Sequence, residues 1–198
     1  MKRDTRSEIL KEAKKQFNER GFNAVSTGDI AGALQISKGN LTYYFKKKEE
    51  IVEAILLESE GGPLPDVPAG MMELNDYFAD MQQVVQENAF YFWHHAQLSQ
   101  LSPKIRERQN VVYQQNTAKL TKALAILQAD GMLRKEEYTG EYDHVVDSLL
   151  LSSIYWLPFC QLKQEGPSDI GFQSHAWSVL YPLLTAVGRE TLKGIMGR

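Results

Sequence analysis

The stretch from Ser26 to Phe45, STGDIAGALQISKGNLTYYF, decides the fold of this chain. Ser26 and Asp29 have the spacing of a capping box, in which each side chain accepts a hydrogen bond from the other residue's backbone N–H. Ser37 can cap another helix only a few residues later. The stretch therefore predicts two short helices, the second over 38–45, joined by a tight turn at Gln35 and Ile36.

A longer helix is expected before this stretch. Thr5 and Glu8 form a second T-x-x-E capping box, and the apolar side chains of Ile9, Ala13 and Phe17 recur at helical spacing. Gly21 supplies the end of the helix, because glycine adopts the left-handed conformation at little cost. Three helices thus fall within the first 50 residues.

The remainder of the chain also has helical spacing. Lysines 46–48 lead into an apolar-periodic helix that reaches Glu58, and the glycines and prolines of residues 61–68 end it. Beyond them we expect helices over 71–87, 88–101, 103–129, 141–164 and 169–188. Pro158 and Pro182 predict kinks or a broken turn in the last two. Strand patterns are nearly absent, so the predicted fold class is all-α.

The charge is distributed unevenly between the two parts of the chain. The formal net charge is −3, which taken alone argues against a nucleic-acid binder. Residues 1–50, however, carry 11 Lys and Arg against 7 Asp and Glu, whereas residues 51–198 carry 11 against 18. A basic head on an acidic body indicates two tasks in one chain.

Composition excludes several other classes of protein. Cys160 is the single cysteine, so no intrachain disulfide can form and zinc ribbons and iron–sulfur clusters lack their ligands. The N-terminal residues are charged, unlike a signal peptide. No uninterrupted apolar run approaches the roughly 20 residues of a membrane span. We expect a soluble, cytoplasmic protein.

The two short helices and their tight turn match the helix-turn-helix pattern, whose second helix enters the major groove of DNA. Leu41 and Phe45 are four residues apart and are expected to face the core. The polar residues of the same helix then point outward. These are Lys38, Asn40, Thr42, Tyr43 and Tyr44.

Each outward residue suits a particular contact. Lys38 can donate to guanine O6 and N7, Asn40 can pair with adenine, and the Thr42 methyl can touch a thymine methyl. Tyr43 and Tyr44 suit phosphates or base faces. Lysines 46–48 lie where phosphates would pass, although a run of charges can equally be a solvated surface.

The stretch from Arg6 to Ile51 resembles the DNA-binding head of the TetR family of bacterial regulators. The matching elements are Ile9-Leu10, Ala13, Phe17, Gly21-Phe22, Ser26, Asp29-Ile30-Ala31, Ile36-Ser37-Lys38-Gly39, Leu41, Tyr44-Phe45 and Lys48-Glu49-Glu50-Ile51. Family members form homodimers, usually through the last two long helices, bind palindromic operators and mostly repress. A small molecule that enters the helical body releases the DNA.

The resemblance also implies which residues contact DNA. Positions that match family contacts are Lys38, Gly39, Asn40, Thr42, Tyr43, Tyr44 and Lys48. Ser26, Thr27 and Ser37, at the starts of the two short helices, complete the predicted set, because free N–H groups there favour phosphate. Two positions depart from the family. Gln35 replaces a usual glycine and must adopt a left-handed backbone, and Thr42 stands where tyrosine is common, which alters the expected base preference.

The body contains aromatic residues that could line a pocket for an apolar or aromatic effector. The candidate ligand-binding residues are Trp93, His94, Tyr113, Asn116 and Trp156. The alternative is that these residues belong to the bundle core or a dimer interface. Adjacent His94 and His95 point about 100° apart on a helix and chelate a metal poorly. We expect no cofactor, no metal and no catalytic site, since nucleophile and metal motifs are absent.

The sequence thus predicts a one-component regulator, most simply a repressor. Residues 1–50 form the DNA-binding domain, and residues 51–198 form the ligand-binding and dimerisation domain. Its partners are palindromic double-stranded DNA, a second copy of the chain and a small molecule, without a membrane. The alternatives are a constitutive regulator or activator that senses no ligand, and an all-α binding protein or enzyme with a vestigial head.

Overall fold

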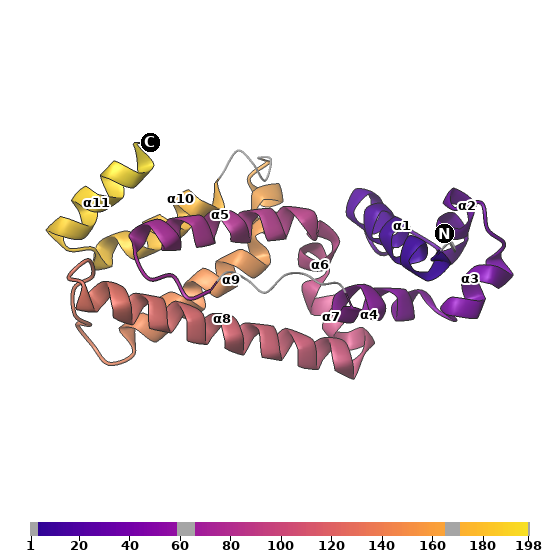
Figure 1. Ribbon diagram of the computed structural model, residues 1–198, viewed down its shortest axis with the longest axis horizontal. Coiled ribbons are helices and arrows are strands. Elements are labelled where there is room, and N and C mark those ends of the chain that lie inside the picture. Colours follow the sequence, from indigo (N-terminus) through magenta and orange to yellow (C-terminus); the bar gives the residue numbers. More distant parts are fainter. Residues whose placement is uncertain (1–3, 59–65, 165–170, 198) are drawn as a thin grey trace. The chain divides into compact units, whose positions relative to one another are not determined.

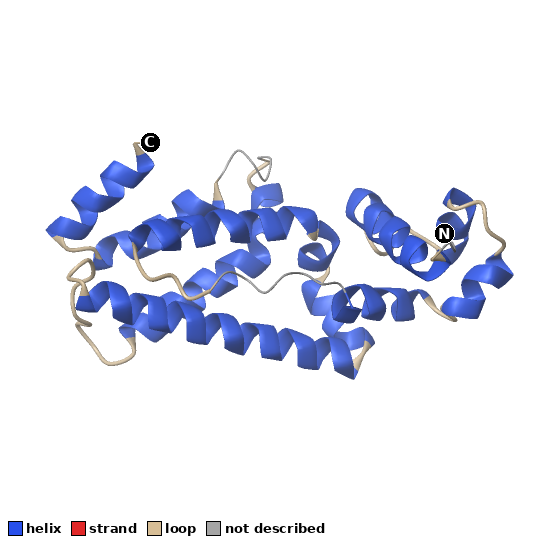
Figure 2. Ribbon diagram, in the orientation of Figure 1, coloured by secondary structure: helices blue, strands red, loops and turns tan. Residues whose placement is uncertain are grey.

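The computed structural model describes residues 4–58, 66–164 and 171–197, which form helices joined by short loops (Figure 1, Figure 2). Within these ranges, β structure is confined to an isolated antiparallel bridge between Leu133 and Leu184. The packing divides the chain into two compact units. The first comprises residues 1–61 and 87–110, and the second comprises residues 62–86 and 111–198. The predicted all-α fold is confirmed.

The first unit is built around the three helices of the head. Its helices are α1 (Thr5–Arg20), α2 (Thr27–Ala33), α3 (Lys38–Tyr44), α4 (Lys48–Glu58), α6 (Ala89–Trp93), α7 (His95–Leu101) and the first turns of α8 (Pro103–Ala129). Phe17 lies at the centre of the core, with its ring centroid 5.6 Å from those of Phe22 and Phe90. Leu41 and Phe45 are buried in the same core, as the four-residue spacing predicts.

The caps of the short helices follow the sequence prediction. The backbone N–H of Asp29 donates to Ser26 Oγ at 3.2 Å, and the backbone N–H of Ser26 donates to Asp29 Oδ2 at 2.8 Å. Ser37 Oγ accepts from the backbone N–H of Asn40 at 3.1 Å. Because each helix has only seven residues, these caps satisfy a large share of its unpaired N–H groups.

The predicted capping box of the first helix is wrong. Asp4 is the N-cap of α1, and its Oδ1 accepts from the backbone N–H of Ser7 at 3.2 Å. Thr5 is therefore the first helical residue, and Thr5 and Glu8 form no box. An aspartate immediately before Thr5 is an equally good cap, so the helix starts one position earlier. Gly21 ends α1 with φ of +81°, as expected.

The turn between α2 and α3 contains the left-handed residue that the family resemblance implies. Gln35 has φ of +54°, a region that non-glycine residues rarely adopt. Its backbone N–H donates to the Gly32 carbonyl at 3.1 Å, and that of Ile36 donates to the Ala31 carbonyl at 3.0 Å. The left-handed residue reverses the chain within two positions and brings α3 against α2.

The second unit is a helical body with its own core. It contains α5 (Met71–Glu87) up to Gln86, the remainder of α8, α9 (Glu141–Leu162), α10 (Phe172–Leu180), the 3-10 turn η1 (Tyr181–Leu183) and α11 (Ala186–Met196). Phe78, Trp156, Phe172 and Trp177 meet through edge-to-face ring contacts. Asn75 Oδ1 accepts from the side chains of Gln173, at 2.8 Å, and Trp177, at 3.1 Å, which ties α5 to α10.

Helix α9 is apolar on more than one face. By length and composition alone it could cross a membrane, with a mean hydropathy of 1.3 over its most apolar window. This is weak evidence, because core helices of soluble proteins have the same composition. Leu149, Val146 and Trp156 place one face of α9 in the body core.

Two predicted helices are interrupted. The helix expected over 88–101 divides at His94, whose φ of −116° and ψ of +17° are not helical. The helix expected over 169–188 ends at Leu180, because Pro182 cannot donate a backbone hydrogen bond, and η1 and α11 follow. Pro158 is accommodated within α9, which ends at Leu162. Residues 59–65, 169 and 170 lie outside the described residues. Most of the predicted break at 61–68 and the predicted start of the last helix therefore lie outside them as well.

The packing units do not coincide with the functional division predicted at residue 50. Helix α4 packs with the head, and so do residues 87–110. The predicted boundary between a DNA-binding domain over 1–50 and a body over 51–198 divides the chain by function, not by packing. It stays a prediction.

Helix α11 docks closely on the loop between α8 and α9. Thr185 Oγ1 donates to the Gly131 carbonyl at 2.7 Å, and the Thr185 N–H donates to the Met132 carbonyl at 3.0 Å. A Cβ added at Gly188 would lie 2.2 Å from that Met132 oxygen. Glycine at this position permits the close approach, because a rigid backbone atom cannot give way.

We therefore expect Gly188→Ala to destabilise the body by about 1–3 kcal/mol through overpacking. Gly194→Ala is the matched control on the same helix, since no heavy atom lies within 4 Å of its added Cβ. The control is expected to gain roughly 0.5–1 kcal/mol from helix propensity. Urea unfolding followed by circular dichroism measures both changes, and equal stability of the two variants would contradict the docking.

Candidate nucleic-acid interface

The exposed face of α3 is the most distinctive surface of the head. Leu41 and Phe45 are 1% and 4% exposed, whereas Tyr43 on the same helix is 84% exposed. Tyr43 and Tyr44 meet edge to face, with ring centroids 5.2 Å apart. Such large exposed aromatic side chains cost solvation energy unless a partner covers them. The face therefore has the character of a binding surface.

Hydrogen bonds within α3 determine which polar groups remain available. Thr42 Oγ1 donates to the Lys38 carbonyl at 2.8 Å, so its hydroxyl is engaged by the backbone. Ser37 Oγ is engaged as the N-cap. The side-chain amide of Asn40 makes no hydrogen bond to the residues that the structure describes, and it remains available for an external partner. Gly39 is exposed on the first turn, where a missing side chain permits close approach.

Lys38 extends from α3 across the start of α2. A Cβ added at Gly28 would lie 3.0 Å from Lys38 Cε and 3.5 Å from its Nζ. The aliphatic part of this lysine thus covers the glycine at the N-terminal end of α2. Its charge lies between the starts of the two short helices, which also carry positive partial charge. The arrangement concentrates positive potential on this face.

An open hollow of about 470 Å³ lies beside α2, lined by Asn23, Ala24, Val25, Ser26, Thr27, Lys46, Lys47, Lys48 and Glu49. Lys46 and Lys47 are exposed, and Thr27 is half-buried at the start of α2. The Ser26 hydroxyl donates to Asp29 Oδ2 at 2.6 Å, and this bond is the main cause that lowers the pKa of Asp29. Ser26 therefore acts first as a cap, and the lysines supply the charge of the hollow.

Lys48 lies differently from the expectation of a free phosphate-binding cation. Its Nζ donates to the carbonyls of Phe22, at 2.7 Å, and Val25, at 2.8 Å, and lies 4.2 Å above the Phe22 ring centroid. Partial burial lowers the pKa of Lys48. The ammonium joins the start of α4 to the loop between α1 and α2. A phosphate contact by Lys48 stays a prediction, and this positioning role adds to it.

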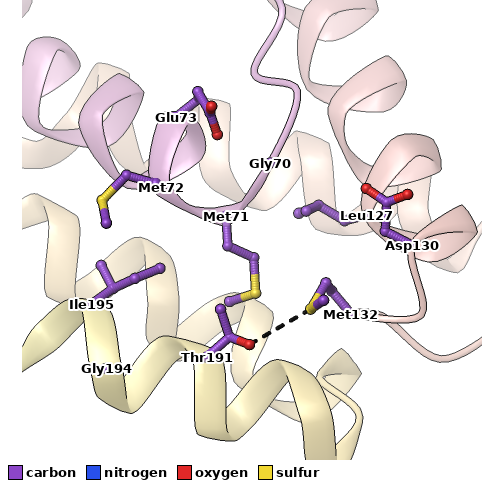
Figure 3. A pocket seen from close by; sticks show the side chains of 10 residues that line it. All are labelled: Gly70, Met71, Met72, Glu73, Leu127, Asp130, Met132, Thr191, Gly194 and Ile195. Carbon is purple, nitrogen blue, oxygen red and sulfur yellow. Dashed lines mark hydrogen bonds between the residues drawn. The ribbon is translucent and has the colours of Figure 1, made fainter.

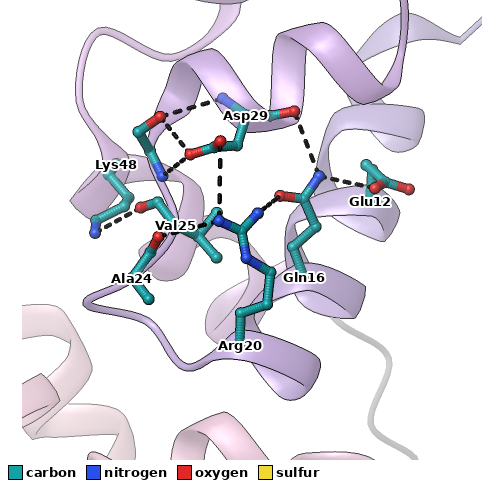
Figure 4. A network of polar contacts seen from close by, with 8 residues as sticks. Glu12, Gln16, Arg20, Ala24, Val25, Asp29 and Lys48 are labelled. Carbon is teal, nitrogen blue, oxygen red and sulfur yellow. Dashed lines mark hydrogen bonds and ion pairs between the residues drawn. The ribbon is translucent and has the colours of Figure 1, made fainter.

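A polar network holds α1 against α2 (Figure 4). Gln16 Nε2 donates to Glu12 Oε1 at 2.8 Å and to the Asp29 carbonyl at 3.5 Å. Arg20 lies 3.9 Å from Asp29 Oδ1 and donates to the Ala24 carbonyl at 3.4 Å. Sequence reasoning did not identify Gln16 and Arg20, because their contacts with Asp29 join positions 13 and 9 residues apart across a turn.

Residues 87–104 lie outside the head in the sequence and form hydrogen bonds with α1 and α4. Asn18 donates to the Glu87 carbonyl at 2.9 Å and accepts from the Phe90 N–H at 3.0 Å. Glu53 on α4 accepts from Ser102 Oγ at 2.6 Å and from Lys104 Nζ at 2.9 Å. These bonds lower the pKa of Glu53. The orientation of the head's helices thus depends on residues far along the chain.

The five predicted ligand-binding residues are divided between the two units. Trp93 and His94 belong to the first unit, where His94 Nδ1 bonds Gln97 at 3.2 Å and its ring meets Phe22 edge to face. Tyr113 donates to Asp147 Oδ1 at 2.9 Å in the second unit, and Asn116 is half-buried there. Trp156 is 2% exposed within the body core. Their role in binding a ligand stays a prediction.

Comparison with known proteins identifies the architecture. A family model described as bacterial regulatory proteins of the tetR family matches residues 9–55, and one described as bacterial transcriptional repressor matches residues 57–192. The HTH-type transcriptional regulator QacR of Staphylococcus aureus is 45% identical over 51 residues, which are 26% of this chain and 27% of QacR. The chain thus aligns with about a quarter of the length of this relative.

Two solved structures share the fold over nearly the whole chain. A TetR-family transcriptional regulator from Marinobacter aquaeolei has a TM-score of 0.81 at 21% identity, covering 95% of each chain. A regulator from Saccharomonospora viridis, in complex with choline, has a TM-score of 0.70 at 19% identity, covering 92% of this chain and 98% of that one. At these identities the likeness concerns the fold.

The position of Lys48 leads to a test of its structural role. We expect Lys48→Met to destabilise the first unit by about 1–2 kcal/mol, because two carbonyls lose their charged donor. Lys47→Met is the matched control, since Lys47 is exposed and is expected to change stability by less than about 0.5 kcal/mol. Urea unfolding measures both, and an unchanged midpoint for Lys48→Met would show that its two hydrogen bonds do not stabilise the head.

Proposed function

This chain belongs to the TetR family of bacterial regulatory proteins, and from that premise we propose that it acts in the cytoplasm as a homodimeric repressor whose α3 reads the major groove of a palindromic operator. As a member of this family the chain is a transcriptional regulator and not an enzyme. The observation that carries the proposal is the face of α3, polar and exposed opposite the buried side chains of Leu41 and Phe45.

The available groups on α3 suit direct readout of bases. Asn40 offers a free amide, which pairs with the N6 and N7 edge of adenine. Thr42 presents its methyl group, because its hydroxyl is held by the Lys38 carbonyl, and a methyl favours thymine. Lys38 can reach guanine only by leaving its position over Gly28. We expect adenine and thymine to be the better specified bases of each half-site.

Phosphates would be held around this helix. Tyr43 and Tyr44 provide phenol hydroxyls at the end of α3, and Lys46 and Lys47 provide charge in the adjoining hollow. Contacts of this kind position a protein on DNA without reading sequence. The acidic residues of the body would repel the DNA backbone, which favours approach by the basic head.

Dimerisation through α9 is supported by an apolar stripe on its exposed side. Leu151, Tyr155, Phe159 and Leu162 are 60%, 45%, 45% and 83% exposed, and their spacing of four, four and three residues places them on one face. The opposite face already lies in the core. A second exposed apolar stripe on a core helix is typical of a surface that a partner covers.

Ligand sensing is supported by unpaired polar groups inside the body. Tyr77 OH, Thr117 Oγ1 and Trp156 Nε1 are buried without a hydrogen-bond partner among the described residues. Burial raises the pKa of Tyr77 to about 12, so its hydroxyl stays a neutral donor. Buried polar groups are normally paired, and a ligand with acceptor atoms would supply the missing bonds.

Binding to DNA can be tested with a duplex selected from a random library. We expect Asn40→Ala to weaken specific binding by about 5- to 150-fold, from the loss of roughly 1–3 kcal/mol of base discrimination, and to leave non-specific binding unchanged. Lys47→Ala is expected to weaken both alike and to reduce the slope against salt by about one.

The matched control is Lys122→Ala, an exposed lysine of the second unit, which is expected to change neither quantity. Binding titrations at several salt concentrations give affinities and slopes together. If Asn40→Ala bound every sequence as the unchanged protein does, α3 would not read bases through this residue.

The dimer surface has a separate test. We expect the double change Leu151→Glu and Phe159→Glu to produce a monomer in sedimentation experiments, because two buried charges in an apolar interface cost several kcal/mol. Tyr138→Glu is the control, since Tyr138 is 56% exposed and lies outside α9. A dimer that persisted in the double variant would place the interface elsewhere.

A further inference from the structure

We propose that a hollow at the N-terminal end of α5 binds a small amphiphilic organic cation, such as an alkylammonium ion. The hollow lies within the second unit and has a volume of about 370 Å³. Its walls come from the start of α5, the end of α8, the following loop and α11 (Figure 3). Pockets that hold small organic molecules have volumes of roughly 300–1,000 Å³.

The inner surface of the hollow is apolar and adaptable. Met71 and Leu127 are buried side chains at its base, and Met132 and Ile195 close it from the loop and from α11 (Figure 3). The Thr191 hydroxyl donates to the Val187 carbonyl of its own helix at 3.0 Å and lies 3.8 Å from Met132 Sδ. Thioether side chains are flexible and polarisable, so they adjust to an alkyl chain of varying shape.

The ionisable residues that line the hollow are both acidic. Glu73 and Asp130 are the ionisable residues of its lining. Neither carboxylate has an ion-pair partner within the described residues. The Glu73 carboxylate folds back over Gly70, with Oε2 2.7 Å from the position that a Cβ there would occupy. A cation is therefore attracted to this rim and an anion is repelled.

An apolar base beside two unpaired carboxylates selects a ligand with an alkyl chain and one positive charge. A neutral alkane would gain the apolar contacts but not the Coulombic attraction. An anion would lose more through repulsion by the carboxylates than it gains from the apolar contacts. Gly194 lies in the wall, and no heavy atom lies within 4 Å of a Cβ added to it. A larger residue at this position therefore extends into open space, which gives a way to fill the hollow without a clash.

The probes are octylammonium, octanol and octanoate, titrated into the full chain by calorimetry below their aggregation concentrations. We expect octylammonium to bind with one site per chain, octanol at least about threefold more weakly, and octanoate not measurably. Equal affinity for octylammonium and octanol, or tighter binding of octanoate, would overturn the assignment of a cation site.

Variants locate the binding. Gly194→Leu is expected to reduce octylammonium affinity at least tenfold by filling the hollow, whereas Gly194→Ala retains it. The double change Glu73→Gln and Asp130→Asn is expected to remove the preference for octylammonium over octanol while leaving octanol binding unchanged. This double variant tests the same claim if Gly194→Leu does not fold. Undiminished octylammonium binding by folded Gly194→Leu, or an undiminished preference in the double variant, would place the ligand elsewhere. These measurements use no DNA, so their failure leaves the proposed operator binding untouched.

Discussion

The burial of Leu41 and Phe45 in the head core is the constraint on which the proposed function depends. A helix of seven residues is unstable in isolation, because nucleation costs more than its few hydrogen bonds return. These two side chains anchor α3 and fix its rotation about its own axis. The rotation in turn determines that Asn40, Thr42 and Tyr43 face outward. Readout of DNA therefore follows from packing on the inner side of the same helix.

Residues outside the head maintain that packing. Asn18 bonds the chain at Glu87 and Phe90, and Glu53 bonds Ser102 and Lys104. Helix α8 contributes its first turns to the first unit and its remaining turns to the second. In the proposed mechanism, an effector that shifts the body would act on the head through such shared elements, and DNA would weaken effector binding by the same factor.

Local signals in the sequence predicted much of the head. The Ser26 and Asp29 box and the Ser37 cap are each determined by residues within three or four positions, whereas the left-handed Gln35 was implied by the resemblance to the TetR family. The Thr5 box was wrong because Asp4, one residue earlier, competes for the same role. The sequence around His94 has no proline or glycine that would signal its non-helical backbone. The apolar periodicity therefore predicted an uninterrupted helix.

Long-range contacts could not be predicted in the same way. The carbonyls that hold Lys48 lie 23 and 26 residues away, and a motif position cannot reveal where a flexible ammonium turns. The five candidate ligand residues were chosen for their chemistry. Helical spacing alone does not reveal that residues such as Trp93 and Trp156 belong to separate units. The unpaired Tyr77 hydroxyl likewise becomes evident only when its burial is known.

The most direct test of the central claim is methylation protection with dimethyl sulfate on a duplex selected by the protein. This reagent modifies guanine N7 in the major groove and adenine N3 in the minor groove. If α3 reads the major groove as part of a dimer, guanines within or beside each half-site are protected at N7, in two inverted blocks about one helical turn, or a multiple of it, apart. Protection of adenine N3 with guanine N7 fully reactive would contradict the account.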